Sequence, residues 1–309
     1  MSTRPQLSII VVTHNSWPDV QRCLKSIAIT AAHLDPQVIV VDNHSSDDTA
    51  RAIRDQFPTV ELIESPTNDG YGVAVNRAAQ HATGEFMMLL NPDAALRPGA
   101  ADQLVRVARR PSTGVVGPLL LQADGNPQPS ARRFPSSWRL LFEVSRLHRL
   151  LSRERRGDLL LGTYWDQSTT RRVDWVSGAC HVFRRSLWDE VGPLTERTFC
   201  GFDDFEYCLR AADAGYATVH VATAIVDHGV GTSVSKRWSP LEVDQLAAHN
   251  MYVLLQEHWS RRRFRAYAFV EGLAALPRSR TQARLSFGIA LGTAQPVVRC
   301  EPRPVGSPA

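Results

Sequence analysis

The sequence predicts an α/β fold with a mostly parallel central sheet, helices on both of its faces and a helical appendage at the C-terminus. Short apolar runs alternate with helical periodicity through residues 7–90. Such alternation is typical of β-α-β units, whose right-handed crossovers produce parallel strands. Polar residues directly follow three of the runs, as expected at the ligand-binding edge of an open sheet. A chain of 309 residues with 43% hydrophobic residues is long enough to bury a sizeable core.

Four apolar runs are expected to form the first strands of this sheet. The runs over 7–12 and 86–90 lack polar alternation, which indicates strands buried on both faces, as parallel sheets require. The intervening helices start at a proline suited to a first helical turn, at a group of capping side chains and at a glycine-rich turn. The strands are expected at 7–12, 37–41, 60–63 and 86–90, and the helices after Pro18, after 45–48 and after 68–72.

The most informative polar group after a strand contains Asp93. Pro92 excludes Asn91 from the helical region, so both polar side chains stand on a stiff turn at the carboxyl end of the strand. A carboxylate there suits a hard divalent cation on a diphosphate. The alternative is an ordinary aspartate in a strand-to-helix loop. Neither G-x-G-x-x-G nor G-x-x-x-x-G-K-[ST] follows a strand, so a metal held by Asp93 is the natural candidate to neutralise phosphate.

A basic insert is expected in the middle of the chain, after a helix over 98–110 and the apolar stretch 114–119. Residues 132–156 contain eight arginines and two glutamates, a net charge of +6. Apolar residues recur at helical spacing and predict one basic amphipathic helix. This helix could pack on the body as an ordinary surface helix or lie on a membrane. The apolar positions are Trp138, Leu141, Val144, Leu147 and Leu151.

The charge distribution favours a membrane surface over nucleic acid as a partner. Residues 258–309 carry a net charge of +7, so the net total of +4 leaves the rest of the chain at −9. A nucleic-acid binder usually has a basic recognition fold, whereas basic segments with interleaved apolar residues suit anionic lipid. The apolar windows are too short for a spanning helix, and we expect a cytoplasmic protein. Five scattered cysteines without a C-x-x-C spacing indicate reduced thiols.

The second half of the chain carries two further groups that could take part in catalysis or binding. Asp203 and Asp204 are expected in the first turn of a helix, where they could serve as capping acids. Their aromatic neighbours could instead raise the pKa of one acid toward that of a working base. His228 precedes a loop rich in glycine and hydroxyl residues that could approach a phosphate, although a structural histidine is the alternative. A loop over 173–180 leads into a strand at 181–183, and short strands are expected at 219–221 and 225–226.

We expect three regions in the chain. Residues 1–238 form a catalytic domain, with a nucleotide half over about 1–118 and an acceptor half over about 119–238. Residues 239–295 form a helical, basic region that associates with the membrane. Residues 296–309 form a disordered tail.

Six motifs in the same order resemble glycosyltransferase family 2, whose members are inverting nucleotide-sugar enzymes of the GT-A fold. The resemblance extends from about residue 7 to about 235. Asn-Pro-Asp, in place of the usual Asp-x-Asp, and the stretch from Gly117 to Arg132 are most similar to bacterial rhamnosyltransferases. The motifs are Thr13-His14-Asn15, Asp42-Asn43-His44-Ser45, Asn68-Asp69-Gly70-Tyr71-Gly72, Asn91-Pro92-Asp93, Asp203-Asp204 and His228.

The resemblance implies a role for each matching position. Asp42 would bind the N–H of a pyrimidine base. Asp93 and His228 would hold Mg²⁺ or Mn²⁺, and Asp204 would be the general base. Asp203 stands where the family has glutamate, so either aspartate could remove the proton. The other nucleotide-sugar residues would be Thr13, Asn15, Asn43, Asn68, Gly70, Asn76 and Asn91, and the acceptor residues would be Arg132, Trp175, Ser177 and Gly178.

The implied reaction transfers L-rhamnose from dTDP-rhamnose to N-acetylglucosamine on a polyprenyl diphosphate, in cell-wall or surface-polysaccharide synthesis. The enzyme would sit peripherally on the inner face of the plasma membrane, and Arg132 and Arg133 could meet the acceptor diphosphate. A second copy of the chain is a further candidate partner. The alternatives are a transferase of the same fold that uses UDP-galactofuranose or another nucleotide sugar, and a non-catalytic scaffold that binds sugar nucleotides.

Overall fold

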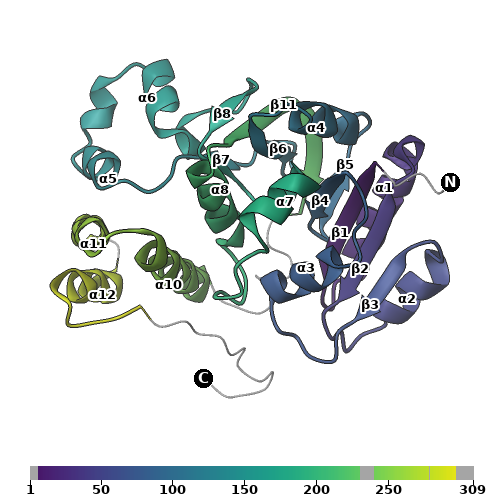
Figure 1. The fold of residues 1–309 in the computed structure, drawn as a ribbon. Helices are drawn as coiled ribbons and strands as arrows, with labels where there is room; N and C mark the ends of the chain where they lie inside the picture. The colour runs from purple at the N-terminus through teal and green to yellow at the C-terminus, as the bar shows by residue number, and fades with distance from the viewer. Residues whose placement is uncertain (1–5, 230–239, 278, 297–309) are drawn as a thin grey trace.

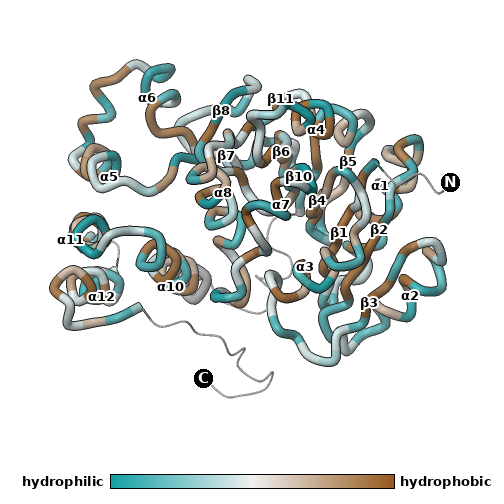
Figure 2. The backbone as a smooth tube through the Cα atoms, in the orientation of Figure 1, coloured by the Kyte–Doolittle hydropathy of each residue, from teal (hydrophilic) through white to brown (hydrophobic). Residues whose placement is uncertain are grey.

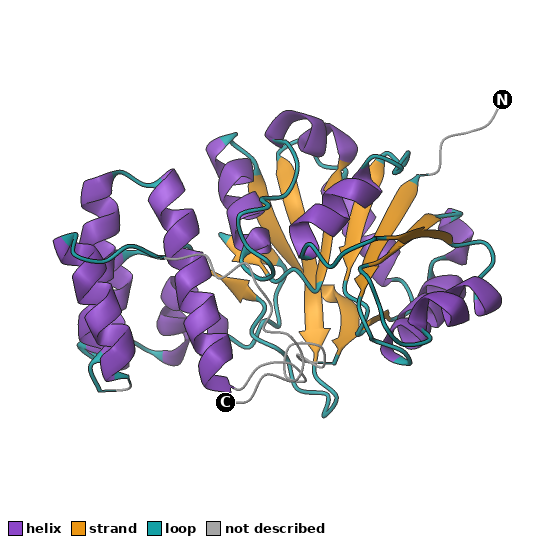
Figure 3. Ribbon diagram, turned by 90° about the horizontal axis from the view of Figure 1, so that it is seen from below, coloured by secondary structure: helices purple, strands orange, loops and turns teal. Residues whose placement is uncertain are grey.

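The expected α/β architecture is confirmed. The computed structural model describes residues 6–229, 240–277 and 279–296. A curved central sheet runs through the molecule and helices cover both of its faces (Figures 1 and 3). The strands of the main sheet are β1 (Leu7–Thr13), β2 (Gln37–Asp42), β3 (Glu61–Glu64), β4 (Phe86–Leu90), β5 (Ala94–Leu96), β6 (Thr113–Leu121), β8 (Arg171–Val173), β10 (Cys180–Arg184) and β11 (Ala217–His228).

The sheet is mostly parallel in its N-terminal half and mixed beyond it. The strand order is β3-β2-β1-β4-β10-β6-β11-β5, with β8 pairing with β11. β1, β2, β3 and β4 are mutually parallel, whereas β10 is antiparallel to both of its neighbours. β11 is one strand with register shifts, not the two short strands that the sequence indicated. A small second sheet pairs β7 (Ala131–Arg132) with β9 (Trp175–Val176).

Both faces of the central strands are buried, as their sequences predicted. Side chains alternate along a strand, so Ile10 of β1 belongs to one buried cluster, with residues of α3 and α8, while Ile9 belongs to another, with residues of α1 and α4. The apolar runs appear as brown segments at the centre of the molecule in Figure 2. The helices between residues 19 and 213, outside the basic insert, are α1 (Asp19–Thr30), α2 (Thr49–Gln56), α3 (Tyr71–Ala79), α4 (Ala100–Ala108), α7 (Arg185–Val191) and α8 (Asp203–Asp213).

The basic insert differs from the single amphipathic helix that we expected. It contains α5 (Ser137–Val144), the short 3-10 helix η2 (Leu147–Leu150) and α6 (Arg153–Leu160). Arg146 has a φ of 59°, which no α-helix accommodates, so the first helix ends there. Hydrophobic periodicity continued across this break and therefore did not reveal it.

The C-terminal helices contribute to a buried cluster that they share with the central sheet. They are α10 (Pro240–His258), α11 (Arg261–Ala275) and α12 (Arg280–Leu291). Leu254, Leu255 and Tyr267 belong to the same buried cluster as Phe205 of α8. The domain boundary at residue 238 and the role of the C-terminal region remain predictions. Most of the tail and most of the expected loop after His228 lie outside the described residues. Among the described residues, no helix combines the length and apolar character needed to cross a membrane.

Candidate active site

The three polar groups after β1, β2 and β4 lie at one edge of the sheet. Thr13 and Asp42 are register partners at the ends of β1 and β2, and β4 lies on the other side of β1. The backbone N–H of Asn43 donates to the carbonyl of Thr13 over 2.8 Å. The expectation that a parallel sheet would gather these groups is confirmed.

Asp42 offers an unused acceptor at this edge. Its side chain is buried, and Oδ1 accepts a hydrogen bond of 2.8 Å from the backbone N–H of Ser45. Its Oδ2 atom is buried without a hydrogen-bond partner. Because a buried acceptor without a donor costs free energy, Oδ2 is a strong candidate to receive an N–H from a ligand.

Thr13 and Asn15 organise the loops around Asp42. The buried Thr13 hydroxyl pairs with the hydroxyl of Ser16. Asn15 has a φ of 49°, and its Oδ1 atom accepts hydrogen bonds from the backbone N–H groups of Ser46 and Asp47, at 2.7 and 3.3 Å. Both residues are therefore next to Asp42 in the fold, and their contact with a nucleotide remains a prediction.

Asn43, Asn68 and Gly70 form one hydrogen-bonded cluster. The Nδ2 group of Asn43 donates to Oδ1 of Asn68 over 2.8 Å and to the carbonyl of Gly70 over 3.2 Å. Gly70 has a φ of 98°, and a Cβ atom there would lie 2.4 Å from the carbonyl oxygen of Phe199. Only glycine fits this position. The cluster thus joins the loop after β2 to the loop that precedes α8.

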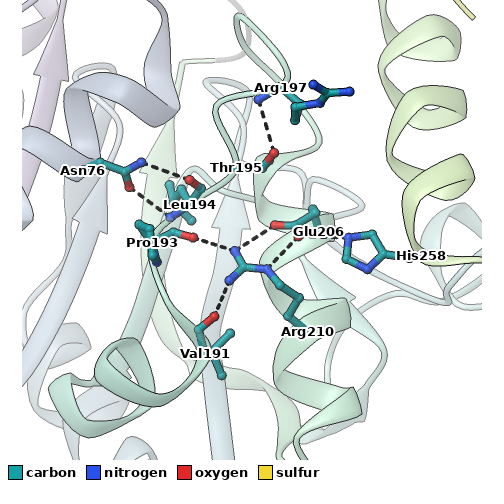
Figure 4. Close-up of polar contacts among 9 residues, drawn as sticks. All are labelled: Asn76, Val191, Pro193, Leu194, Thr195, Arg197, Glu206, Arg210 and His258. Carbon is teal, nitrogen blue, oxygen red and sulfur yellow. Dashed lines mark hydrogen bonds and ion pairs between the residues drawn. The ribbon is translucent and has the colours of Figure 1, made fainter.

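The amide of Asn76 is occupied by a loop of the protein. In Figure 4 it faces Leu194, whose N–H and C=O exchange hydrogen bonds of 2.9 and 3.0 Å with it. A third hydrogen bond, of 2.8 Å, joins Asn76 Nδ2 to Glu196. These contacts give Asn76 a role in positioning the loop over 194–196. The predicted nucleotide contact is untested.

Asp93 and His228 converge from β4 and β11. Both side chains are buried, and Oδ1 of Asp93 lies 3.3 Å from Nε2 of His228. On the other side of the ring, Nδ1 of His228 lies 2.8 Å from Oε1 of Gln128. With Oε1 as the acceptor, Nδ1 is the donor of this hydrogen bond, and the ring then directs Nε2 toward the Asp93 carboxylate.

This pair fits a divalent cation. A carboxylate oxygen and an imidazole nitrogen that lie 3.3 Å apart are both possible ligands of one ion. Neighbouring ligands of an octahedral ion with bonds of about 2.1 Å are about 3.0 Å apart, close to this separation. Asn91 is next to them, with Nδ2 3.5 Å from Nε2 of His228. In the part of the chain that the structure describes, no group of three or more His, Cys, Asp and Glu is placed to hold a metal.

The acid pair begins α8, as predicted. Asp203 accepts a hydrogen bond of 3.1 Å from the N–H of Gly201, and it is buried. Burial first, and the charge of Asp204 second, raise the pKa of Asp203 to about 7. Asp204 accepts hydrogen bonds from the N–H of Gly178, at 2.6 Å, and from that of Phe205, at 2.7 Å. The acid with the raised pKa is therefore Asp203.

Tyr71 is a neighbour of the acids that the sequence did not single out. Burial and the charges of Asp203 and Asp204 raise the pKa of its hydroxyl well above the ordinary value. The phenol consequently stays protonated beside the two carboxyl groups. The position of Tyr71 in the Asn-Asp-Gly-Tyr-Gly motif was the one sequence feature that could have marked it as a site residue.

Two of the predicted acceptor residues, Gly178 and Arg132, interact with Asp204, and Trp175 packs beside Arg132. Arg132 and Trp175 are register partners of β7 and β9, and the guanidinium lies 5.5 Å from the centre of the Trp175 ring. Burial lowers the pKa of Arg132, while the charge of Asp204 raises it. Gly178 meets Asp204 directly, and a Cβ atom there would lie 3.2 Å from the Cβ atom of Asp204. Ser177 precedes Gly178, and its N–H donates to the carbonyl of Ser130 over 2.8 Å.

A backbone hydrogen bond links the acid pair to the Asp93–His228 pair. The N–H of Asn91 donates to the carbonyl of Ala179 over 3.0 Å. Ala179 directly follows Gly178, the hydrogen-bond donor to Asp204. The candidate metal ligands and the candidate base therefore flank one short segment that joins β9 to β10.

The C-terminal helix α10 holds the loop that leads into the acid pair. The Nδ2 group of the buried Asn250 donates to the carbonyl of Cys200 over 2.9 Å, and Glu257 pairs with Arg197 at 2.7 Å. His258 lies 3.0 Å from Glu206 of α8. No sequence motif indicated these contacts.

Glu206 and Arg210 anchor the same loop from its other side. The guanidinium of Arg210 pairs with the carboxylate of Glu206 through two hydrogen bonds of 2.6 and 2.9 Å. It also donates to the carbonyls of Val191, at 2.5 Å, and Pro193, at 2.7 Å (Figure 4). The loop over 191–201 is thus fixed by α3, α8 and α10.

Comparison with known proteins identifies relatives of the chain. A model of the family described as Glycosyl transferase family 2 matches residues 8–191. The N-acetylglucosaminyl-diphospho-decaprenol L-rhamnosyltransferase of Mycobacterium tuberculosis is 30% identical over 281 residues. That alignment covers 82% of this chain and 85% of the relative.

Solved structures share the fold at low sequence identity. The crystal structure of GalNAc-T7 with UDP, GalNAc and Mn²⁺ matches with a TM-score of 0.63 and 16% identity, over 90% of this chain and 52% of that one. This chain thus spans about half of GalNAc-T7. The mannosyltransferase PcManGT from Pyrobaculum calidifontis, in complex with GDP-Man and Mn²⁺, matches with a TM-score of 0.57 and 19% identity, over 96% of this chain and 82% of that one.

Proposed function

The chain belongs to glycosyltransferase family 2 and has the GT-A fold, and on this basis we propose that it transfers L-rhamnose from dTDP-rhamnose to an N-acetylglucosamine carried on a polyprenyl diphosphate. The proposed donor and acceptor follow the rhamnosyltransferase of Mycobacterium tuberculosis, whose name gives a diphospho-decaprenol acceptor. The anomeric centre of the sugar would invert in a single displacement.

The observation that carries this proposal is the placement of three sets of polar groups at one edge of the sheet. They are the unpartnered Oδ2 of Asp42, the Asp93–His228 pair and the Asp203–Asp204 pair. The first would receive the N–H of the pyrimidine base. The second would meet the diphosphate through a cation, and the third would meet the acceptor hydroxyl.

We assign Asp204 as the general base and Asp203 as its positioning neighbour. The two N–H donors on Asp204 fix its carboxylate beside Gly178 and near Arg132, where the acceptor would lie. Asp204 would take the proton from the acceptor hydroxyl as that oxygen attacks the anomeric carbon from the face opposite the nucleotide. A proton held on Asp203 would limit charge repulsion within the pair.

Asp93 and His228 would hold Mg²⁺ or Mn²⁺. The ion, when bound, would supply positive charge to the leaving nucleoside diphosphate. Two protein ligands suffice because substrate phosphates and water complete the shell of such ions. Gln128 would keep the His228 ring in the tautomer that presents Nε2.

The proposed acceptor places the enzyme at the inner face of the plasma membrane. A polyprenyl chain stays in the bilayer, so the sugar on its diphosphate is reachable only from the membrane surface. The basic, partly apolar insert supports this location.

A donor screen with a metal titration tests the proposed function. Purified full-length protein would be given dTDP-rhamnose, UDP-galactofuranose or UDP-N-acetylglucosamine with a soluble, short-chain polyprenyl diphosphate N-acetylglucosamine. We expect transfer from dTDP-rhamnose that requires Mg²⁺ or Mn²⁺. Transfer from UDP-galactofuranose alone would replace the proposed donor. Binding of nucleotide sugars with neither transfer nor hydrolysis would overturn the catalytic assignment.

A further inference from the structure

The basic insert exposes a dense group of large apolar side chains. Their exposed fractions range from 39% for Val144 to 83% for Leu150, and all of them fall within thirteen residues of sequence. Scattered apolar residues are normal on protein surfaces, but a contiguous group of this kind marks a contact site. The group consists of Trp138, Leu141, Val144, Leu147 and Leu150.

Only one side of α5 faces the protein body. Leu140 and Arg139 of α5 line a cavity of about 230 Å³ between the insert and α11. Trp138 and Leu141 therefore lie on the other side of α5, away from the protein body. The insert forms the outer edge of the molecule, where hydrophobic and hydrophilic positions alternate along the tube in Figure 2.

Exposed arginines accompany the apolar group. Arg146, Arg149, Arg153 and Arg155 are all exposed. Within the described residues, none of these four guanidinium groups forms an ion pair with an acidic side chain. We call the five apolar residues and these four arginines the insert surface. Its charge is complementary to that of an anionic partner.

The cavity beneath α5 relates the insert surface to the catalytic acids. Arg132, Arg133 and Tyr267 are among its lining residues. The negative charge of Asp204 also acts on Arg132. It raises the pKa of the Arg132 guanidinium, whereas burial lowers that pKa. Arg132 therefore connects the cavity beneath α5 with the acid pair.

We propose that the insert surface docks on the headgroup region of an anionic phospholipid bilayer. The apolar side chains enter the boundary between headgroups and acyl chains, and the arginines bind lipid phosphates. The partner is a lipid surface because arginines interleave with apolar residues, which suits a layer of phosphates over hydrocarbon. This inference rests on the proposed function, since a polyprenyl diphosphate acceptor would then reach the cavity from the bilayer.

Vesicle flotation of the full-length protein tests the proposal. Vesicles would contain phosphatidylcholine alone or with 30% phosphatidylglycerol, at low and high salt. We expect salt-sensitive binding to the anionic vesicles, with about fivefold weakening for each arginine removed. Arg146→Glu/Arg149→Glu and Leu150→Glu should each weaken binding by about tenfold or more. Circular dichroism would check that the variants fold.

Matched controls lie on the other side of the molecule. Ile29 of α1 is as exposed as Leu150, at 80%, and Arg106 and Arg110 are exposed on and after α4. Ile29→Glu and Arg106→Glu/Arg110→Glu should bind vesicles like the wild type. Equal binding by the insert variants and these controls would overturn the proposal. So would binding to neutral vesicles that equals binding to anionic ones.

Two further outcomes separate this inference from the proposed function. Loss of self-association in Leu150→Glu, with unchanged vesicle binding, would assign the surface to a second copy of the chain and overturn the lipid assignment. The insert variants should hydrolyse dTDP-rhamnose at the wild-type rate. If the wild type binds anionic vesicles but does not turn over any nucleotide sugar, the proposed function is overturned. The proposal that the insert surface binds lipid is then retained.

Discussion

The backbone N–H of Gly178 donates a hydrogen bond of 2.6 Å to the Oδ2 atom of Asp204. This bond orients the candidate base from a segment that is distant in sequence. Gly178 leaves the space that the carboxylate occupies, because a Cβ atom there would lie 3.3 Å from Oδ2. The position of the candidate base thus depends on the segment that connects β9 to β10.

Replacement of the base should abolish transfer without unfolding the protein. We expect Asp204→Asn to lower the rate of transfer by about 10³-fold, because an amide cannot take the proton from the hydroxyl group of the acceptor sugar. Gly178→Ala should lower it by about tenfold through displacement of Asp204. Steady-state transfer assays measure both effects. Near-normal turnover of Asp204→Asn, with loss of activity in Asp203→Asn, would move the base to Asp203.

The stability of the protein should depend on pH through Asp203. Its pKa rises from an ordinary 3.8 to about 7 on folding, so the folded state holds a proton that the unfolded chain releases between these values. Stability from this residue is therefore present at low pH and lost as pH rises toward about 7. Urea unfolding of wild type and Asp203→Asn at pH 5 and pH 8 measures the effect. The variant should lose less stability across this range, whereas parallel profiles would contradict the raised pKa.

Gln128 should influence metal use although it is not itself a proposed ligand. Replacing it with leucine removes the acceptor for Nδ1 of His228 and frees the ring to turn or change tautomer. We expect the metal concentration for half-maximal activity to rise by about 10- to 100-fold. Gln122→Leu, on the same stretch of chain, should leave it unchanged. Asp93→Ala should lose activity at every metal concentration. An unaltered metal titration for Gln128→Leu would contradict this role.

Asn250 should act as a positioning residue for the acid pair. Asn250→Ala removes the hydrogen bond to the Cys200 carbonyl, which precedes Asp203 by three residues, and should cost about 1–3 kcal/mol of stability. We expect kcat to fall by about tenfold, with little change in KM for the donor. The control is Gln256→Ala, at an exposed position on the same helix. A variant that loses stability but keeps its kcat would limit Asn250 to a structural role.

The N-terminal half of the fold follows closely from local sequence. The runs from Leu7 and from Phe86 begin as strands at the expected residues, because strands buried on both faces need uninterrupted apolar sequence. Parallel pairing then places Thr13 beside Asp42 without further information. The pairing of distant acids and histidines came only from the resemblance, since spacing alone does not report which loops meet.

Other features depend on contacts that periodicity does not contain. The turn at Arg146 interrupts a pattern that continues on both sides of it, so the insert looked like one helix. The same pattern was compatible with Trp138 packed inward or exposed. The hydrogen bonds of Gln128 to His228 and of Asn250 to Cys200 join residues 100 and 50 positions apart. Such long-range pairs are fixed by tertiary packing, which a single sequence does not reveal.

The attachment of α10 to the loop before Asp203 bears on how this enzyme could be re-engineered or could diverge. The stretch matched by the family model ends at residue 191, before the acid pair and well before α10. A chimera that exchanges the C-terminal helices between two relatives would therefore also replace the partner of the Cys200 carbonyl. Such exchanges should succeed only when α10 and the loop over 191–201 are inherited together.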